Sequence, residues 1–144
     1  MKEIKIHNGY EYIRTHPQMF FGKDEVTGFD LLSAIMASAS KITGFKCVIY
    51  DDDLFVIHSH TDWIVEHYNS IDKFLKTTDA HTFDKNSPDF YHYGVLVYVF
   101  STHIATINSE YLINHKGHLT IERIETFMKK HHLAEEGFYF IFSV

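Results

Sequence analysis

The chain has 144 residues, 45 % of them hydrophobic and 16 % aromatic, and a formal net charge of −6 with histidine neutral. This length and composition predict one folded domain spanning residues 1–144 and exclude a disordered chain. The acidic balance argues against binding to nucleic acid, and the absence of any run of about 18 apolar residues argues against a membrane span. A single cysteine, Cys47, leaves no internal disulfide to form, so the sequence predicts a cytoplasmic protein.

Apolar spacing, capping residues and stop signals predict the elements in chain order. Helices are expected at residues 8–15, 28–43, 63–75, 99–108 and 121–133. Strands are expected at residues 45–50, 54–59 and 137–144, with a hairpin of two short strands at 110–114 and 118–120. A polar loop is expected at residues 76–93. Strands grouped with long helices predict an α/β (α+β) two-layer sandwich, in which helices cover one face of a mixed or antiparallel sheet.

Two of these elements carry more detailed expectations. The three aspartates at residues 51–53 favour a tight hairpin turn between the first two strands, rather than a metal site. The helix at 121–133 is amphipathic, and its inward side chains are expected to be Ile121, Ile124, Phe127 and Met128. Its charged face is interpreted as a solvated surface.

One phrase near the start resembles a known family. Residues 14–22 read R-T-H-P-Q-M-F-F-G, and the pattern R-x-x-P-x-M-x-x-G is similar to a signature of the ATPase domain of the DNA gyrase B subunit, a GHKL ATPase. Further matches follow in order: F-D-K-N-S at 83–87, S-E-Y-L at 109–112 and G-F-Y-F-I-F at 137–142. The resemblance implies the GHKL (Bergerat) fold, a mixed sheet covered on one face by helices.

The positions that hold Mg-ATP in the family are replaced here. The catalytic Glu and the metal-binding Asn of the first long helix fall at about Ile35 and Ala39, and residues 31–43 contain no Glu, Asp, Asn or Gln. In place of the adenine-binding D-x-G-x-G stand Ser59, Thr61 and Trp63, with Asp62 as a displaced candidate for the lost aspartate.

The glycine-rich lid of the family keeps only Gly94, within Y-G-V-L-V-Y-V-F-S at 93–101. Bulky residues disfavour the backbone conformations that such a phosphate-binding loop needs. With all three sites replaced, no catalytic residue, no cofactor and no metal are expected.

Histidine pairs offer no stronger site. His58 and His60 are expected to point to one face of a strand, but two ligands fall short of the three or four that zinc requires. The pairs at 115 and 118 and at 131 and 132 are interpreted as solvated.

The sequence therefore predicts a non-catalytic protein-binding module. An immunity protein that covers a toxin, or a decoy or regulator of gyrase or another GHKL protein, are its concrete forms. Two alternatives stay open. The pocket around Ser59, Asp62 and Trp63 could bind a nucleotide or another small molecule in an altered mode. The chain could also be an unrelated α/β domain, which a structure without the helix–hairpin–helix order would establish.

Overall fold

A five-stranded sheet with the order β1-β2-β5-β3-β4 runs through the molecule, and every neighbouring pair of strands is antiparallel. The computed structural model describes residues 9–39, 45–76, 93–109 and 111–144. The strands are β1 (Phe45–Asp51), β2 (Leu54–Ser59), β3 (His103–Asn108), β4 (Tyr111–Lys116) and β5 (Phe138–Ser143). The predicted polar loop at 76–93 lies almost wholly outside the described residues, and the motif at 83–87 lies entirely outside them.

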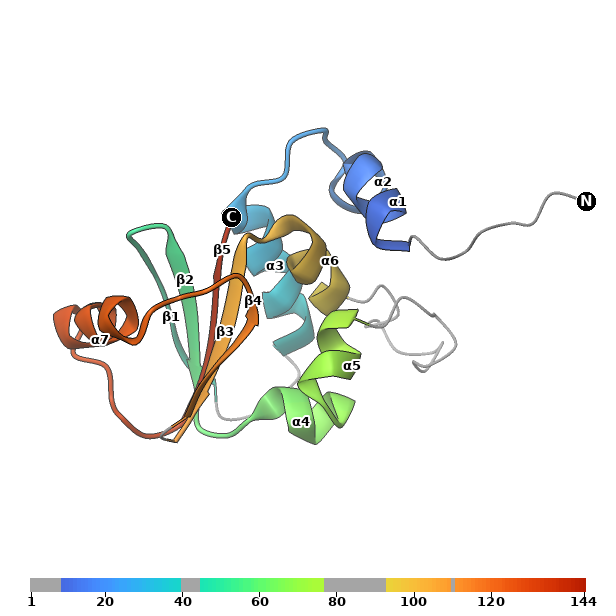
Figure 1. The fold of residues 1–144 in the computed structure, drawn as a ribbon. Coiled ribbons are helices and arrows are strands. Elements are labelled where there is room, and N and C mark those ends of the chain that lie inside the picture. The colour runs from blue at the N-terminus through green and yellow to red at the C-terminus, as the bar shows by residue number, and fades with distance from the viewer. Residues whose placement is uncertain (1–8, 40–44, 77–92, 110) are drawn as a thin grey trace, which may run out of the picture.

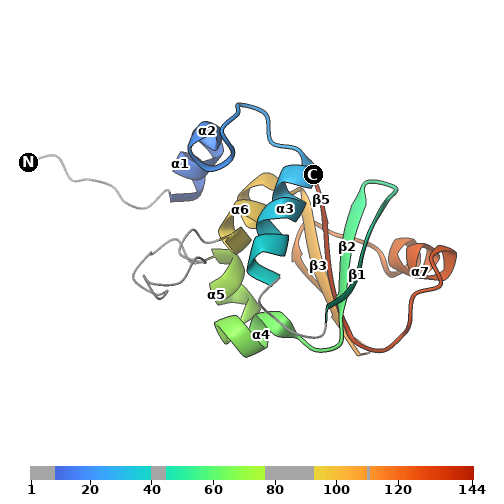
Figure 2. The ribbon, with the colours of Figure 1, turned by 180° about the vertical axis from the view of Figure 1, so that it is seen from behind.

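Helices lie on both faces of this sheet (Figures 1 and 2). One face carries a helical layer of α1 (Gly9–Thr15), α2 (Pro17–Phe21), α3 (Gly28–Ala39), α4 (Trp63–Tyr68), α5 (Ile71–Lys76) and α6 (Tyr93–Phe100). The opposite face, called the α7 face below, carries α7 (Ile121–Lys130). None of the helices described is both long and apolar enough to cross a membrane.

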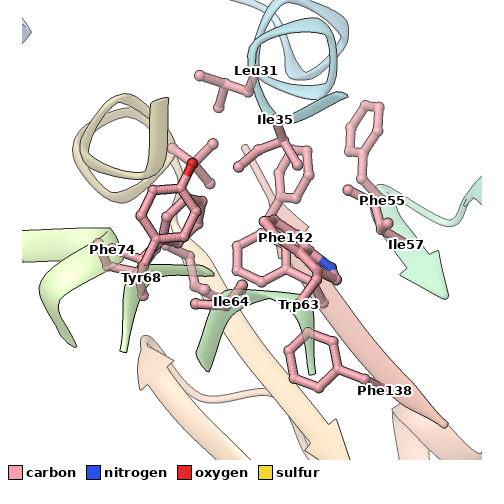
Figure 3. Close-up of a cluster of buried hydrophobic side chains, with 14 residues drawn as sticks. Leu31, Ile35, Phe55, Ile57, Trp63, Ile64, Tyr68, Phe74, Phe138 and Phe142 are labelled. Carbon is pink, nitrogen blue, oxygen red and sulfur yellow. The ribbon is translucent and has the colours of Figure 1, made fainter. Parts of the chain in front are cut away.

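The middle strand, β5, explains why the core is divided in two. All six of its residues are buried, and successive side chains of a strand point to opposite faces. Phe138, Phe140 and Phe142 pack against the helical layer, whereas Tyr139 and Ile141 pack against α7. Figure 3 shows the larger cluster, in which side chains of α3, β2 and β5 meet those of α4 and α5.

The predicted two-layer sandwich is confirmed, with two refinements. The described sheet is antiparallel rather than mixed, and α7 adds cover on the second face through Ile124 and Phe127. The prediction that Ile121 points inward is wrong, because 56 % of this side chain is exposed.

The hairpin turn at residues 51–53 is confirmed. Asp52 and Asp53 both have positive φ, 49° and 60°, as a two-residue turn between twisted strands requires. The predicted helix at 63–75 is instead two helices, because Asn69 adopts a φ of 72° and ends α4. Pro17 ends α1 as expected, but it also occupies the first turn of α2, where a missing N–H costs nothing.

The region after residue 93 differs most from expectation. The helix predicted at 99–108 is wrong: α6 ends at Phe100 and β3 follows. The hairpin predicted around Lys116 and Gly117 is also wrong, because β4 pairs with β3 instead. The apolar run at 95–99 has strand-like composition, yet it forms a helix that is buried on nearly every side. A buried environment removes the amphipathic pattern from which a helix is recognised.

Candidate functional site

Two of the predicted nucleotide-site positions, Ile35 and Trp63, are part of the hydrophobic core. Ile35, on α3, is fully buried in the cluster of Figure 3. Trp63, the first residue of α4, is 1 % exposed in the same cluster. Its ring meets Phe74 edge-on at 5.5 Å between centroids and Phe140 at 6.3 Å. Ala39 is the last residue of α3, and its side chain lies outside the described set.

The polar positions between β2 and α4 are engaged in the turn itself. Ser59 Oγ donates to the carbonyl oxygen of Thr61 at 2.9 Å, and Thr61 Oγ1 donates to Glu66 at 3.3 Å. Asp62 is the N-cap of α4 and accepts a hydrogen bond from the N–H of Val65 at 3.1 Å. Burial raises the pKa of Asp62, although the backbone N–H groups partly offset this. Asp62 therefore caps the start of α4, and Ser59 and Thr61 make hydrogen bonds within the turn that precedes it.

Gly94 has a packing role in the structure. It lies in the first turn of α6, which packs on α5. A Cβ at this position would overlap the backbone carbonyl of Phe74, whose carbon would be only 2.8 Å away. The glycine therefore permits close approach of two helices, whereas the resemblance identified it only as the last glycine of a degenerate lid.

The signature phrase at 14–22 also has a local structural account. Pro17 starts α2, and Gly22 ends it in the left-handed conformation, with φ of 72° and its N–H donating to Gln18. Met19 lies on the surface, where Tyr12 Oη contacts its sulfur at 3.1 Å. Proline at the start and glycine just past the end are the residues that a short helix favours at these places.

An open groove lies elsewhere, on the α7 face. Its volume is about 800 Å³. Apolar side chains of β3, β4 and α7 line it, namely Ile107, Leu112, Ile121, Ile124, Met128 and Leu133. Charged or titratable side chains also line it, namely Glu125, Lys129, His132 and Glu135. Sequence reasoning missed this groove, because α7 was taken to bury its whole apolar side.

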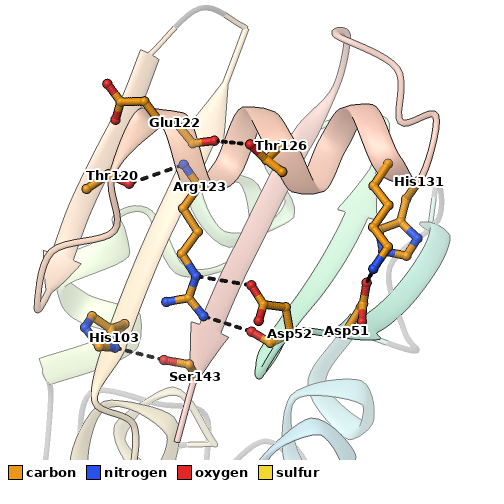
Figure 4. Close-up of polar contacts among 10 residues, drawn as sticks. Asp51, Asp52, His103, Thr120, Glu122, Arg123, Thr126, His131 and Ser143 are labelled. Atoms are coloured by element: carbon orange, nitrogen blue, oxygen red, sulfur yellow. Dashed lines mark hydrogen bonds and ion pairs between the residues drawn. The ribbon is translucent and has the colours of Figure 1, made fainter.

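The hairpin turn fixes α7 in this position (Figure 4). Asp51 is 2.7 Å from Lys130 Nζ and 2.9 Å from His131 Nε2. Hydrogen bonds from Lys130 and His131 lower the pKa of Asp51 to about 2. Arg123 Nη2 donates to the carbonyl oxygen of Asp52 at 2.8 Å. Both ends of α7 are thus bound to the β1–β2 turn, and His131 is not the solvated residue that was predicted.

The remaining histidines that were considered do not form a metal centre. His58 is buried, stacks on Tyr139 at 4.1 Å, and donates from Nε2 to the carbonyl oxygen of Glu136 at 2.9 Å. His60 lies beyond the end of β2 and is exposed. His115 is partly buried, with its Nε2 2.8 Å from Thr106 Oγ1, and burial lowers its pKa. Across the described ranges, no group of three or more potential ligands could hold a metal ion.

Among the predicted site residues, the structure brings together Ile35 and Trp63 in the core and residues 59, 61 and 62 in one turn. Neither these nor Gly94 line the α7-face groove. Comparison with known proteins finds no matching family model, curated protein or solved structure.

Proposed function

We propose that this chain is a GHKL-like domain without ATPase activity that acts as a protein-binding module. The observation that carries the proposal is the enclosure of Trp63, the residue at the position where the family holds adenine. An indole that is 1 % exposed and packed on Phe74 and Phe140 fills interior space between the helical layer and the sheet. A ligand there would have to displace core side chains.

The order of elements supports the same ancestry. The resemblance requires a long helix, a hairpin and a second helix in succession, and α3, β1–β2 and α4 follow in that order. Ile35 is a core residue, Asp62 caps a helix, and Gly94 permits close packing of two helices. These roles explain the three residues without a bound nucleotide.

The α7-face groove is the surface that we assign to the partner. Exposed apolar patches with a polar rim are typical of protein interaction sites. Ile121, 56 % exposed at the start of α7, stands at the groove wall. The partner is another protein, such as a toxin, gyrase or another GHKL protein, that contributes apolar side chains to the groove.

Affinity purification with a matched pair of variants tests this. Ile121→Glu places a charge in the groove, and the added carboxylate suits the N-terminus of α7, so the fold is retained. Val65→Glu makes the same change at an exposed site on α4, in the other layer. The proposal expects a partner that binds wild type and V65E but not I121E. Equal recovery with all three forms would remove the groove from the proposal, and recovery with none would count against the binding function.

The volume of the groove favours one second candidate, a small-molecule site. A groove of about 800 Å³ lies within the range of known ligand pockets, about 300 to 1,000 Å³. Thermal-shift titration with Mg-ATP and ADP, in wild type and I121E, separates the two candidates. A shift in wild type alone would indicate a nucleotide in the groove. A shift in both forms would indicate a nucleotide elsewhere, as in the altered pocket near Ser59 and Asp62.

A further inference from the structure

A row of aromatic side chains crosses the sheet on the face that the helical layer covers, and it ends at an exposed edge. Phe142, Phe55 and Tyr50 lie opposite one another on β5, β2 and β1, so their rings share this face. Phe55 stacks on Phe142 at 4.9 Å between ring centroids, and Tyr50 lies 4.3 Å from Phe55. Phe142 and Phe55 are buried, but Tyr50 is 47 % exposed. The aromatic core therefore continues to the surface at β1.

Phe29 adds a second exposed ring at the end of this row. It is the second residue of α3, which begins at the same end of the sheet as the β1–β2 turn (Figures 1 and 2). Its ring lies 5.0 Å from Tyr50, with 65° between the ring planes, and 5.2 Å from Phe55, with 84° between them. Phe29 is 56 % exposed. Two exposed rings thus stand at an angle to each other and both contact the buried Phe55; we call these three residues the aromatic patch.

The chain on both sides of the aromatic patch is acidic. Residues 22–30, which lead into α3, contain three acidic residues and one lysine, and three aspartates follow Tyr50 directly. Some of these carboxylates already have partners, namely Asp30 with Lys23, Asp51 with Lys130, and Asp52 with Arg123. Within the described part of the chain, Glu25 and Asp53 form no ion pair. Asp53 comes two residues before Phe55, so an uncompensated carboxylate lies close to the patch.

We propose that the aromatic patch binds an arginine side chain from a basic segment of a partner protein. A cation over the face of an aromatic ring is attracted by the negative electrostatic potential of that face. Arginine fits better than lysine, because its planar guanidinium can stack on a ring while its N–H groups donate to a carboxylate such as that of Asp53. The net charge of −6 also attracts a basic segment over a longer range.

This surface is separate from the α7-face groove. Phe29 and Tyr50 do not line the groove, and their rings lie on the opposite face of the sheet. The proposal therefore goes beyond the partner assigned to the groove and does not rest on it. An apolar side chain would contact the two rings without using Asp53, so the charge of the ligand is the property to test.

Titration with a short arginine-containing peptide, followed through the aromatic NMR signals of Phe29 and Tyr50, tests the proposal. The matched ligand is the same peptide with citrulline in place of arginine, which keeps the planar end group and removes its charge. We expect the arginine peptide to shift both signals at millimolar concentration, with an affinity that falls as salt is raised. The citrulline peptide should bind several-fold more weakly.

Three variants locate the site, each followed through the Tyr50 signal. Phe29→Leu keeps an apolar side chain but removes the ring, and it should weaken binding of the arginine peptide about two- to fivefold, the effect of one exposed cation–π contact. Asp53→Asn should weaken binding and reduce its salt dependence, and asparagine also tolerates the φ of 60° at this position, so the turn is retained. Tyr111→Leu, at an exposed tyrosine without a ring contact among the described residues, should bind as wild type does.

An arginine peptide that shifts neither signal would overturn the proposal. Equal affinity for the arginine and citrulline peptides would do the same, because the site would then not recognise charge. An F29L variant that binds as tightly as wild type would place binding away from the patch. Any of these results leaves the groove proposal unchanged, because the variants that test the groove lie on other elements.

Discussion

Replacing Gly94 with alanine separates a packing role from a role in a phosphate-binding loop. Alanine favours a helix over glycine by up to about 1 kcal/mol, so helix propensity alone predicts stabilisation. The structure predicts the opposite sign. The added Cβ would overlap the carbonyl group of Phe74, whose carbon would be 2.8 Å away, and this neighbour is backbone of α5 rather than a mobile side chain. Overpacking of this kind costs about 1 to 3 kcal/mol.

Because the overlap is with backbone, we take the upper part of that cost, about 2 to 3 kcal/mol. After the gain in helix propensity, the net expectation is a loss of about 1 to 2 kcal/mol in the free energy of unfolding, or roughly 3 to 8 °C in Tm for a domain of this size. Urea and thermal unfolding of G94A measure it. Gly28→Ala is the comparison, because there the Cβ would meet the ring of Phe55, a side chain, rather than backbone. We expect a smaller loss for G28A. A G94A variant as stable as wild type, or more stable, would refute the packing account.

Three further predictions concern single side chains. The pKa of Asp51 in the folded protein is about 2, against an ordinary value of 3.8. Its contribution to stability is therefore complete above about pH 4 and is lost as pH falls through about 2. The urea midpoint of D51N should fall less steeply than that of wild type over this pH interval. Burial raises the pKa of Tyr139 to about 12, so the unfolded chain releases this proton first, and stability should fall as pH rises from about 10 to 12. Thermal unfolding of Y139F should lack this alkaline loss, and an unchanged loss would exclude Tyr139 as its cause. Trp63→Ala empties a fully enclosed site and should cost about 3 to 5 kcal/mol in urea unfolding; a loss below about 1 kcal/mol would contradict the enclosure.

The sequence predicts those elements whose signals are local. The aromatic and β-branched run at 137–144 contains β5, and the turn at 51–53 has the φ values that its residues favour. The amphipathic run at 121–133 contains α7, which Thr120 caps by accepting from the N–H of Arg123 at 3.2 Å. Each of these rests on periodicity or capping within one element.

The failures have a common physical cause, which is tertiary context. Val95, Val97 and Val99 favour a strand by composition, yet their burial between neighbouring helices and the sheet stabilises a helix. Ile121 fits the apolar side of α7 by spacing, yet it is exposed because α7 lies over only part of the sheet. The groove could not be predicted for the same reason, since it depends on where a helix rests on a sheet and not on the residues of either element alone.

Under the GHKL-like ancestry that we propose, the predicted site positions have structural roles that need no nucleotide. The Asp62 carboxylate caps α4. Close packing on α5 is sufficient to require a glycine at position 94. Ile35 and Trp63 add buried apolar surface, which stabilises the domain where a ligand site would weaken it. The proposed binding activity is therefore assigned to the surface, at the α7-face groove.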